Sequence, residues 1–291
     1  AHAVTVGGQT GLPFLFQEGA LPHKPVTALE VWDTVPDDWP RELAQVYGRD
    51  WHDPFAWAQR CVEEHGAGLV YLRLQSLHPD NGNRKPEEAA AFVRAFLKKI
   101  PVPLIITGCG DDEKDNAALP LCSEAARGER CLFGAAVQDN YKTLAAAVLA
   151  DGHSLIAESP IDINIAKQLN ILISDMGLSP QRLVIDPTIG PLGYGLEYAY
   201  SIMERCRLAA LAGDKMVAMP FICFVGRETW KVKEARAPQS EFPQWGPEKE
   251  RGVLWEAMTA AALVQAGADI LVMRHPLAAQ KLKEHIDTLC S

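Results

Sequence analysis

Asp186 lies where a short apolar run ends and a loop rich in glycine begins. The run Leu183–Ile185 has the composition of a buried strand, and Gly190 and Gly193 follow the carboxylate within the loop. A carboxylate at the end of a buried strand costs stability unless it accepts hydrogen bonds. Glycine lets backbone approach a bound molecule closely because it has no Cβ. The stretch therefore predicts a ligand over the strand end, or a carboxylate that caps local backbone.

Similar polar residues follow other apolar runs of the chain. They are Asp33, Gln75–Ser76, Gly108–Asp111, Gln138–Asn140, Glu158–Ser159 with Asp162 and Asn164, Asp186 with Thr188, and Arg274–His275. Taken singly, several could be helix N-caps, and His275 could be a cap or a packing residue. Taken together, they are the hydrogen-bonding groups expected of a ligand site formed at the ends of neighbouring strands.

These residues belong to a repeated sequence pattern, in which an apolar run is followed by a polar loop and an amphipathic helix. The predicted strands are 27–32, 68–74, 103–107, 131–137, 154–157, 182–185, 216–224 and 268–273, and the predicted helices begin near 53, 86, 113, 140, 162, 196, 247 and 276. Eight βα units of this length predict an α/β fold of the (β/α)8 (TIM) barrel type, with the polar strand ends on one face. A doubly wound sheet is the alternative, but its GxGxxG motif is missing from the sequence. We expect the barrel at 27–291 and an N-terminal β-hairpin extension at 1–26 that covers its amino-terminal end.

Composition excludes several classes of function. The formal net charge of −9 argues against nucleic acid as a partner. The sequence lacks an apolar run of membrane-spanning length and a signal-peptide pattern, so we expect a cytoplasmic protein without membrane contact. The seven cysteines are irregularly spaced and include no CxxC pair, which predicts reduced thiols and no metal site on this chain.

Two long loops follow predicted strands on the polar face. Residues 33–52 carry Trp39 and Trp51, and residues 225–247 carry Trp230, Phe242 and Trp245 beside Arg227. Loops of this length are commonly lids or binding loops, and tryptophan and arginine are enriched at the energetic centres of protein interfaces. We therefore predict a partner interface at Trp230, Phe242, Trp245 and Arg227. The alternative is that both loops fold back on their own barrel.

Several strings identify the chain as resembling a known family. They are "GCGDDEKD" (108–115), "SPIDINIAKQLNILI" (159–173), "VIDPTIGPLGYGLEYAYSIMER" (184–205), "GDKMVAMPFICFVGRETWKVKEARAP" (213–238) and "WGPEKERGVLWEAMTAAALVQAGADILVMRHP" (245–276). Together they resemble the small (delta) subunit of the corrinoid iron–sulfur protein of the acetyl-CoA pathway. The resemblance covers nearly the whole chain.

This resemblance implies a heterodimeric methyl carrier. Its large subunit holds a [4Fe–4S] cluster and cobalamin, and the small subunit is a barrel that covers the cobalamin. The carrier accepts a methyl group from methyltetrahydrofolate through a separate methyltransferase. It then passes the methyl group to acetyl-CoA synthase, which works with carbon monoxide dehydrogenase. The chain itself would then be a non-catalytic subunit.

The resemblance also suggests which residues face the cobalamin. By position, Asp162, Asn164 and Asp186 match the pterin-holding residues of related methyltransferase barrels. Here they would order the loops that face the corrin, with Thr188, Gly190, Gly193, Arg274 and His275 as the remaining cofactor-binding candidates. The alternative is a stand-alone pterin-dependent methyltransferase barrel that acts on a corrinoid protein.

Overall fold

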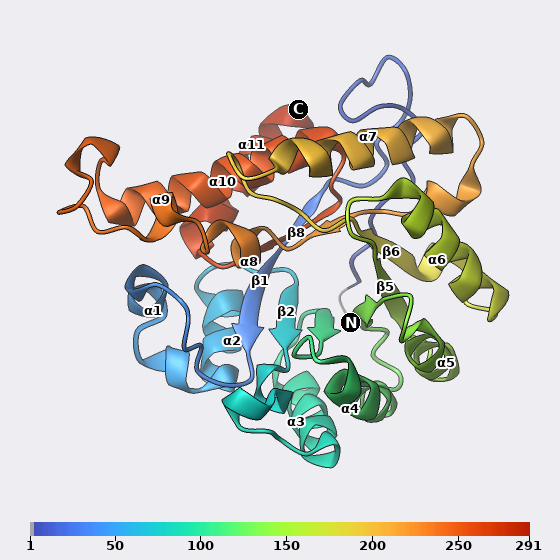
Figure 1. The fold of residues 1–291 in the computed structure, drawn as a ribbon, viewed down its shortest axis with the longest axis horizontal. Helices are drawn as coiled ribbons and strands as arrows, with labels where there is room; N and C mark the ends of the chain where they lie inside the picture. The colour runs from blue at the N-terminus through green and yellow to red at the C-terminus, as the bar shows by residue number, and fades with distance from the viewer. Residues whose placement is uncertain (1–2) are drawn as a thin grey trace.

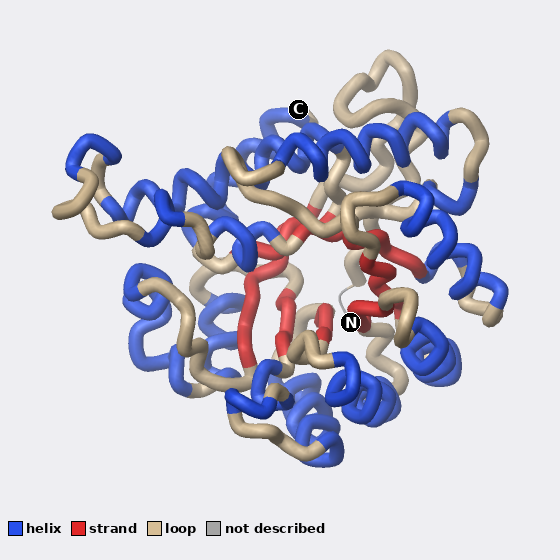
Figure 2. Tube along the Cα trace, viewed as in Figure 1, coloured by secondary structure: helices blue, strands red, loops and turns tan. Residues whose placement is uncertain are grey.

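Eight parallel strands surrounded by helices build the computed structural model, which describes residues 3–291 (Figures 1 and 2). The strands are β1 (Val26–Trp32), β2 (Val70–Arg73), β3 (Leu104–Thr107), β4 (Leu132–Ala136), β5 (Ser154–Glu158), β6 (Leu183–Asp186), β7 (Ile222–Cys223) and β8 (Ile270–Met273). Each overlaps one of the predicted strands. The strands are short and apolar on both faces, as a parallel sheet covered by helices requires.

A helix follows every strand and packs outside the sheet (Figure 2). These helices are α2 (Pro54–Glu63), α3 (Pro86–Lys99), α4 (Asp112–Ala125), α5 (Tyr141–Asp151), α6 (Ile163–Asp175), α7 (Leu196–Leu211), α10 (Glu248–Ala266) and α11 (Pro276–Leu289). Their starts agree with the predicted ones within a residue. None of the helices in residues 3–291 has both the length and the apolar composition of a membrane span.

The sheet runs in the order β6-β5-β4-β3-β2-β1-β8-β7. Its two edge strands meet at Ile185 and Phe221, which form an isolated parallel bridge. The Ile185 amide donates to the Pro220 carbonyl at 2.8 Å. This order with a closing bridge is that of a nearly closed (β/α)8 barrel. It confirms the predicted fold class over the doubly wound alternative.

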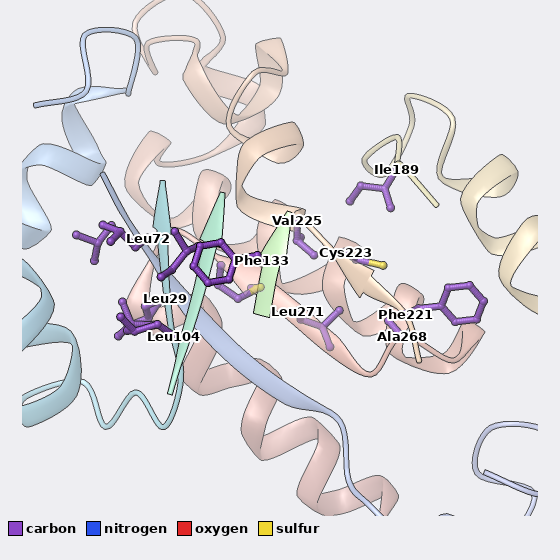
Figure 3. Packing of buried hydrophobic residues seen from close by; sticks show 14 of the residues in the cluster. Leu29, Leu72, Leu104, Phe133, Ile189, Phe221, Cys223, Val225, Ala268 and Leu271 are labelled. Atoms are coloured by element: carbon purple, nitrogen blue, oxygen red, sulfur yellow. The ribbon is translucent and has the colours of Figure 1, made fainter. Parts of the chain in front are cut away.

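Alternation along the strands divides the buried residues into two clusters. Leu29 and Val31 of β1 point outward and pack under the helices, together with residues such as Leu72 and Leu271. Figure 3 shows this outer layer around the strands. Ala28 points inward and packs with Tyr71, Ile105, Ile156 and Val272, which fill the lumen. The lumen is therefore a packed core rather than a pore.

The N-terminal extension differs from the predicted hairpin. Residues 3–25 contain no strand, and residues 1–2 of the predicted extension lie outside the described part of the chain. Thr10 donates its backbone N–H to Ala20 at 3.1 Å, but the three prolines at 13, 22 and 25 supply no N–H for a longer ladder. The segment contacts the amino-terminal end of the barrel, where Val6 packs against the lumen cluster and Gln9 donates to Asp269, just before β8.

The predicted strand 216–224 is mostly not a strand. Only Ile222–Cys223 is extended, and Lys215–Val217 forms a turn of 3-10 helix. The Asp214 side chain caps this turn by accepting from the Met216 amide at 3.1 Å. Pro220 then interrupts the hydrogen-bonding pattern because it has no N–H.

The first long loop folds back on the barrel. It contains α1 (Arg41–Tyr47) and a 3-10 turn at Gly48–His52. Trp39 and Trp51 are buried and pack on Trp57 of α2, with ring centroids 5.4 and 5.3 Å away. For this loop the alternative prediction is confirmed. The second loop contains α8 (Val225–Thr229) and α9 (Lys233–Arg236).

Candidate functional site

Polar side chains line the mouth of the barrel at the carboxyl ends of the strands. Alternate residues of a strand face the same side, so the residue two positions beyond a lumen residue also faces the lumen. The lumen residues Ala28, Tyr71, Ile105, Ile156, Val184 and Val272 are followed in this way by Glu30, Arg73, Thr107, Glu158, Asp186 and Arg274. The mouth is thus a largely charged layer above an apolar core.

Asp186 is a buried member of this layer with one unpaired oxygen. Its side chain is 1% exposed, and its Oδ1 accepts from the Thr188 amide at 2.9 Å. Among residues 3–291, none donates to its Oδ2. Burial and the neighbouring Glu158 carboxylate raise the pKa of Asp186 to about 7. Asp186 is therefore a strand-end carboxylate with one acceptor oxygen that has no donor within residues 3–291.

The glycine-rich loop after β6 is packed on its own backbone and on α10. A Cβ on Gly190 would lie 2.3 Å from the Tyr194 carbonyl oxygen, so this position requires glycine to let the loop close. The Leu192 amide donates to Thr259 at 3.2 Å, and its carbonyl accepts from Trp255. The prediction that Gly190 makes room for a ligand is therefore wrong, because the loop itself occupies that space.

Asp162 and Asn164 lie at the start of α6. The Asp162 Oδ1 accepts from the amides of Asn164 and Ile165, at 2.7 and 3.2 Å, which makes it the N-cap of the helix. Asn164 is exposed on the first turn. For Asp162 the capping alternative is confirmed, since both donors to its carboxylate are local amides.

Arg274 is fixed from several sides. Its guanidinium donates to both oxygens of Glu30, at 2.8 and 3.2 Å, and lies 4.3 Å from the Trp39 ring centroid. Its amide donates to Glu256, and its carbonyl accepts from the Tyr47 hydroxyl at 2.6 Å. Burial alone would raise the pKa of Glu30, but Arg274 holds it below the usual value. Arg274 therefore connects the first long loop to the barrel.

His275 is engaged by its own chain. Its Nδ1 accepts from the Leu277 amide and caps α11, and its ring stacks with Trp230. Burial lowers the pKa of His275 to about 4, so the imidazole is neutral at pH 7. The prediction of a cofactor-binding His275 is not supported by this position, and its alternative as a cap is confirmed.

Two further carboxylates near the strand ends are fully engaged. Asp33 accepts from the Ser76 amide and hydroxyl and forms a salt bridge with Arg84 at 2.8 Å. Asp115, at the start of α4, accepts from the amides of Cys109 and Gly110, at 2.8 and 2.9 Å. Each orders the loop after its neighbouring strand. These groups are structural.

Arg227 reaches over the lumen from α8. A Cβ on Gly226 would lie 2.6 Å from the Arg274 amide nitrogen, so glycine lets α8 lie directly against β8. The Arg227 guanidinium then stands 4.9 Å from the ring centroid of Phe224. The nearby Asp186 carboxylate raises the pKa of Arg227 against the opposing effect of burial. Arg227 therefore belongs to the mouth.

A cleft of about 450 Å³ opens beside these residues. It is lined by Trp32, Asp37, Asp38, Arg73, Gln75, Arg227, Glu228, Lys231 and Arg274. Of the predicted cofactor-binding residues, Arg274 contributes to this lining. Asp162, Asn164 and Asp186 are not part of it, so the predicted set does not converge on a single cavity.

The second long loop projects from the barrel beyond α9 (Figure 1). Phe242 and Trp245 stack at its end with ring centroids 4.1 Å apart, both partly exposed. The Lys233 ammonium lies 4.3 Å from the Phe242 ring. Trp230, in contrast, is 1% exposed and donates to Glu256. The prediction of Trp230 as a surface anchor is therefore wrong, because its ring packs on α10.

Sequence reasoning missed Glu30 and Arg73 and assigned Arg227 only to an interface. Glu30 and Arg73 each stand two positions beyond a lumen residue, so strand alternation was the signal that could have found them. For Arg227 the signal was weaker, since it depends on the short helix α8 after a two-residue strand.

Comparison with known sequences shows a match over almost the whole chain. Residues 1–286 match the family described as CO dehydrogenase/acetyl-CoA synthase delta subunit. The chain is 35% identical to the acetyl-CoA decarbonylase/synthase complex subunit delta of Methanocaldococcus jannaschii, over 98% of the chain and 69% of that protein. It is 35% identical to the subunit of the same name from Archaeoglobus fulgidus, over 99% of the chain and 64% of that protein. The chain thus spans about two thirds of the length of these relatives.

Solved structures with the same fold include dihydropteroate synthases. The enzyme from Xanthomonas albilineans, in complex with indole-2-carboxylic acid and 6-chloroguanine, has a TM-score of 0.59 at 16% identity, covering 92% of this chain and 94% of the enzyme. The Yersinia pestis enzyme has a TM-score of 0.60 at 13% identity, covering 91% and 93%. At these identities the similarity establishes the barrel fold alone.

Proposed function

The chain belongs to the CO dehydrogenase/acetyl-CoA synthase delta subunit family, and from this premise we propose that it is the barrel subunit of a corrinoid methyl carrier. The carrier accepts a methyl group from methyltetrahydrofolate through a separate methyltransferase and delivers it to acetyl-CoA synthase beside carbon monoxide dehydrogenase. The large subunit of the carrier holds the corrinoid and the [4Fe–4S] cluster. This chain covers the corrinoid with the mouth of its barrel.

The incompletely hydrogen-bonded side of the mouth carries this proposal. Asp186 keeps a buried oxygen without a donor within residues 3–291, and Glu158 lies beside it on β5 in register. A corrin ring bears primary amides on its rim, and each offers N–H groups. The acceptors at the β5–β6 strand ends fit such donors, and ligand N–H groups would remove the cost of the unpaired oxygen.

When bound, the corrinoid supplies the nucleophilic metal that carries the methyl group. The residues of this chain act as an enclosure. The apolar core of Ile156 and Val184 below the mouth offers water no polar route from beneath. Excluding water protects a reactive metal centre and strengthens every charge interaction inside the site.

We assign no catalytic residue to this chain. The cysteines at strand ends are poor ligands and poor nucleophiles as they stand, because burial raises the pKa of Cys109 to about 12 and raises that of Cys223 well above its usual value. A subunit that only encloses the corrinoid requires no such group. Its contribution to rate would arise from positioning and from solvent exclusion.

The projecting aromatic pair is the proposed contact with the large subunit. Phe242 and Trp245 form a flat, partly exposed surface, and the Lys233 and Arg251 cations lie against it. Aromatic and arginine side chains of this kind are frequent at the energetic centres of interfaces. A site on a projecting loop can also contact a partner without blocking the barrel mouth.

Purification with the natural partner tests the proposed function. We expect a stable complex that shows a corrinoid absorbance spectrum and contains cobalt and iron, while the isolated chain is colourless. An isolated chain that retains a corrinoid, or that transfers methyl groups alone, would contradict the proposal.

One observation favours the alternative of a pterin-dependent methyltransferase. The unpaired Oδ2 of Asp186 would also accept N–H groups of a pterin ring, and its position at the end of β6 lies within the barrel mouth. Calorimetric titration of the isolated chain with methyltetrahydrofolate separates the two. Micromolar binding that is lost in Asp186→Asn would establish the alternative, and no binding would leave the enclosing role.

A further inference from the structure

The cleft at the mouth contains basic side chains whose hydrogen-bonding capacity is not used up. Arg73 donates to the Cys109 carbonyl at 3.0 Å and lies 5.1 Å from the Trp32 ring centroid. It forms no salt bridge with any residue of 3–291. Arg227 uses its Nε for Glu228 at 2.9 Å, which leaves its terminal nitrogens unbonded within the described chain.

Both guanidinium groups are held in place by aromatic rings beneath them. Tyr71, two positions before Arg73, packs on Phe224 with ring centroids 5.0 Å apart, and Arg227 lies over Phe224. Arginine stacked on an aromatic ring loses little further freedom when it binds a ligand, because its planar fork is already oriented. Arg73 thus lies over Trp32 and Arg227 over Phe224, and both line the same cleft.

The acidic residues in and near the cleft are partly paired with other cations. Glu228 is engaged by Arg227 and by Lys231, whose Nζ lies 3.0 Å from it. Glu30 is engaged by Arg274. Asp37 and Asp38 are exposed at the rim and form no salt bridge within residues 3–291. The Arg73 guanidinium forms no salt bridge within residues 3–291, although its charge reaches the buried carboxylates of Glu30 and Asp115.

A polar group without a partner also lies in the cleft wall. Gln75 is 8% exposed and donates its amide nitrogen to Asn81 at 2.9 Å, while its Oε1 receives no hydrogen bond from residues 3–291. A buried polar atom of this kind indicates a site that is completed by another molecule or by water.

We propose that this cleft binds an oxyanion, a carboxylate or a phosphate group, between Arg73 and Arg227. Two forked guanidinium groups offer paired N–H donors that match the geometry of either group. The unpaired Gln75 Oε1 takes a hydroxyl or N–H of the molecule that carries the anion. The inference goes beyond the proposed function and does not depend on it, because it concerns donors on this chain alone.

Calorimetric titration of the whole chain at low ionic strength tests the proposal, with inorganic phosphate, succinate and a short aspartate-rich peptide as separate probes. We expect one saturable site for at least one probe, with affinity that falls as potassium chloride is added. The variant Arg73→Met should bind about tenfold more weakly. Arg73→Lys, which keeps the charge but loses the fork, should lie between the two.

The matched control is Arg94→Met, which removes an exposed arginine from the outer face of α3 and should bind like the wild type. Circular dichroism and the melting temperature verify that each variant is folded. Saturation by phosphate or succinate would identify a small-molecule anion, and saturation by the peptide alone would identify an acidic partner. No saturation with any probe up to about 10 mM, or unchanged affinity in folded Arg73→Met, would overturn the proposal.

Discussion

Buried carboxylates are fully hydrogen-bonded in one half of the barrel mouth and incompletely hydrogen-bonded in the other. On the side of β1, β2, β3 and β8, Glu30, Asp33, Asp115 and Glu256 each accept several hydrogen bonds or form ion pairs. On the side of β5 and β6, Asp186 accepts one hydrogen bond and keeps one oxygen unpaired within residues 3–291. The Ser159 hydroxyl beside it is also buried without a partner in the described chain.

This difference shows that a polar residue at a strand end is not by itself a sign of function. The satisfied half holds loops in place, since its carboxylates bind local amides and the arginines of neighbouring elements. The unsatisfied half has the same residue types but lacks donors, so burial there is unfavourable until another molecule supplies them. A functional site is best sought where buried polar atoms lack hydrogen-bond partners within the chain.

The largest effect on stability is expected when an ion pair is removed from the hydrogen-bonded half of the mouth. Arg274→Met leaves Glu30 buried without its counter-ion, and removing one partner of a buried ion pair costs about 3–5 kcal/mol of unfolding free energy. Denaturant unfolding measures the loss. The double variant Glu30→Met/Arg274→Met removes both charges and should recover most of it. Equal losses in the single and the double variant would show that packing, and not charge, is responsible.

The stability contributed by the incompletely hydrogen-bonded half should depend on pH. The pKa of Asp186 is raised from 3.8 to about 7 in the folded protein, so its contribution to stability is complete below about pH 4 and is lost as the pH rises through about 7. We expect Asp186→Asn to remove this part of the pH dependence, on the order of 1–3 kcal/mol across that range.

Unfolding at several pH values measures this slope. Glu256 and Asp269, whose pKa values burial raises to about 7 and about 6, titrate in the same direction in both proteins. The difference between wild type and variant therefore reports Asp186 together with its interaction with the neighbouring Glu158 carboxylate. Parallel pH profiles would show that its carboxylate is already satisfied.

A variant in the projecting loop tests whether the partner binds there or at the mouth. Trp245→Ala should weaken association with the large subunit by roughly 2 kcal/mol, about thirtyfold in Kd. Stability of the isolated chain should stay close to that of the wild type. Phe16→Ala removes another exposed aromatic ring, in the N-terminal segment, and serves as the matched control. Unchanged affinity of the Trp245 variant would remove this loop from the interface.

The smallest expected effect concerns a satisfied carboxylate within the unsatisfied half. Asp162→Ala removes the N-cap of α6 and should cost about 0.5–2 kcal/mol of stability. Asp162→Asn retains an acceptor oxygen and should cost only a few tenths of a kcal/mol. Methyl transfer by the assembled complex should be the same in both variants. A slower transfer in the folded asparagine variant would return Asp162 to the ligand site.

The barrel could be predicted from the sequence because its information is local. Each strand is a short apolar run and each helix has a periodic pattern with a recognisable start, such as Pro86–Lys99 after Lys85. The exception was β7, where the apolar run 216–224 contains Pro220 and cannot pair along its length. The predicted hairpin failed for the same reason, since prolines remove the donors that a two-stranded ladder needs.

The site was less predictable because its distinctions depend on contacts between distant residues. Asp162 and Asp186 are both carboxylates after apolar runs, and only the three-dimensional structure shows that one caps a helix while the other faces the lumen. The Glu30–Arg274 pair joins residues 244 positions apart. Trp230 has the composition of an interface anchor, yet its ring is accommodated by Gly252 on α10.

The closure between β6 and β7 has a mechanical consequence. A single bridge at Ile185 and Phe221 joins these strands within residues 3–291, whereas the β5–β6 pair is joined along four residue pairs. Thermal fluctuations that open the cylinder will therefore part this seam first, and backbone amides along it will exchange with deuterium earlier than those of β1 and β2. Asp186 and Arg227 lie on opposite sides of the seam, so the width of the mouth is adjustable at the point where an incoming molecule would lodge.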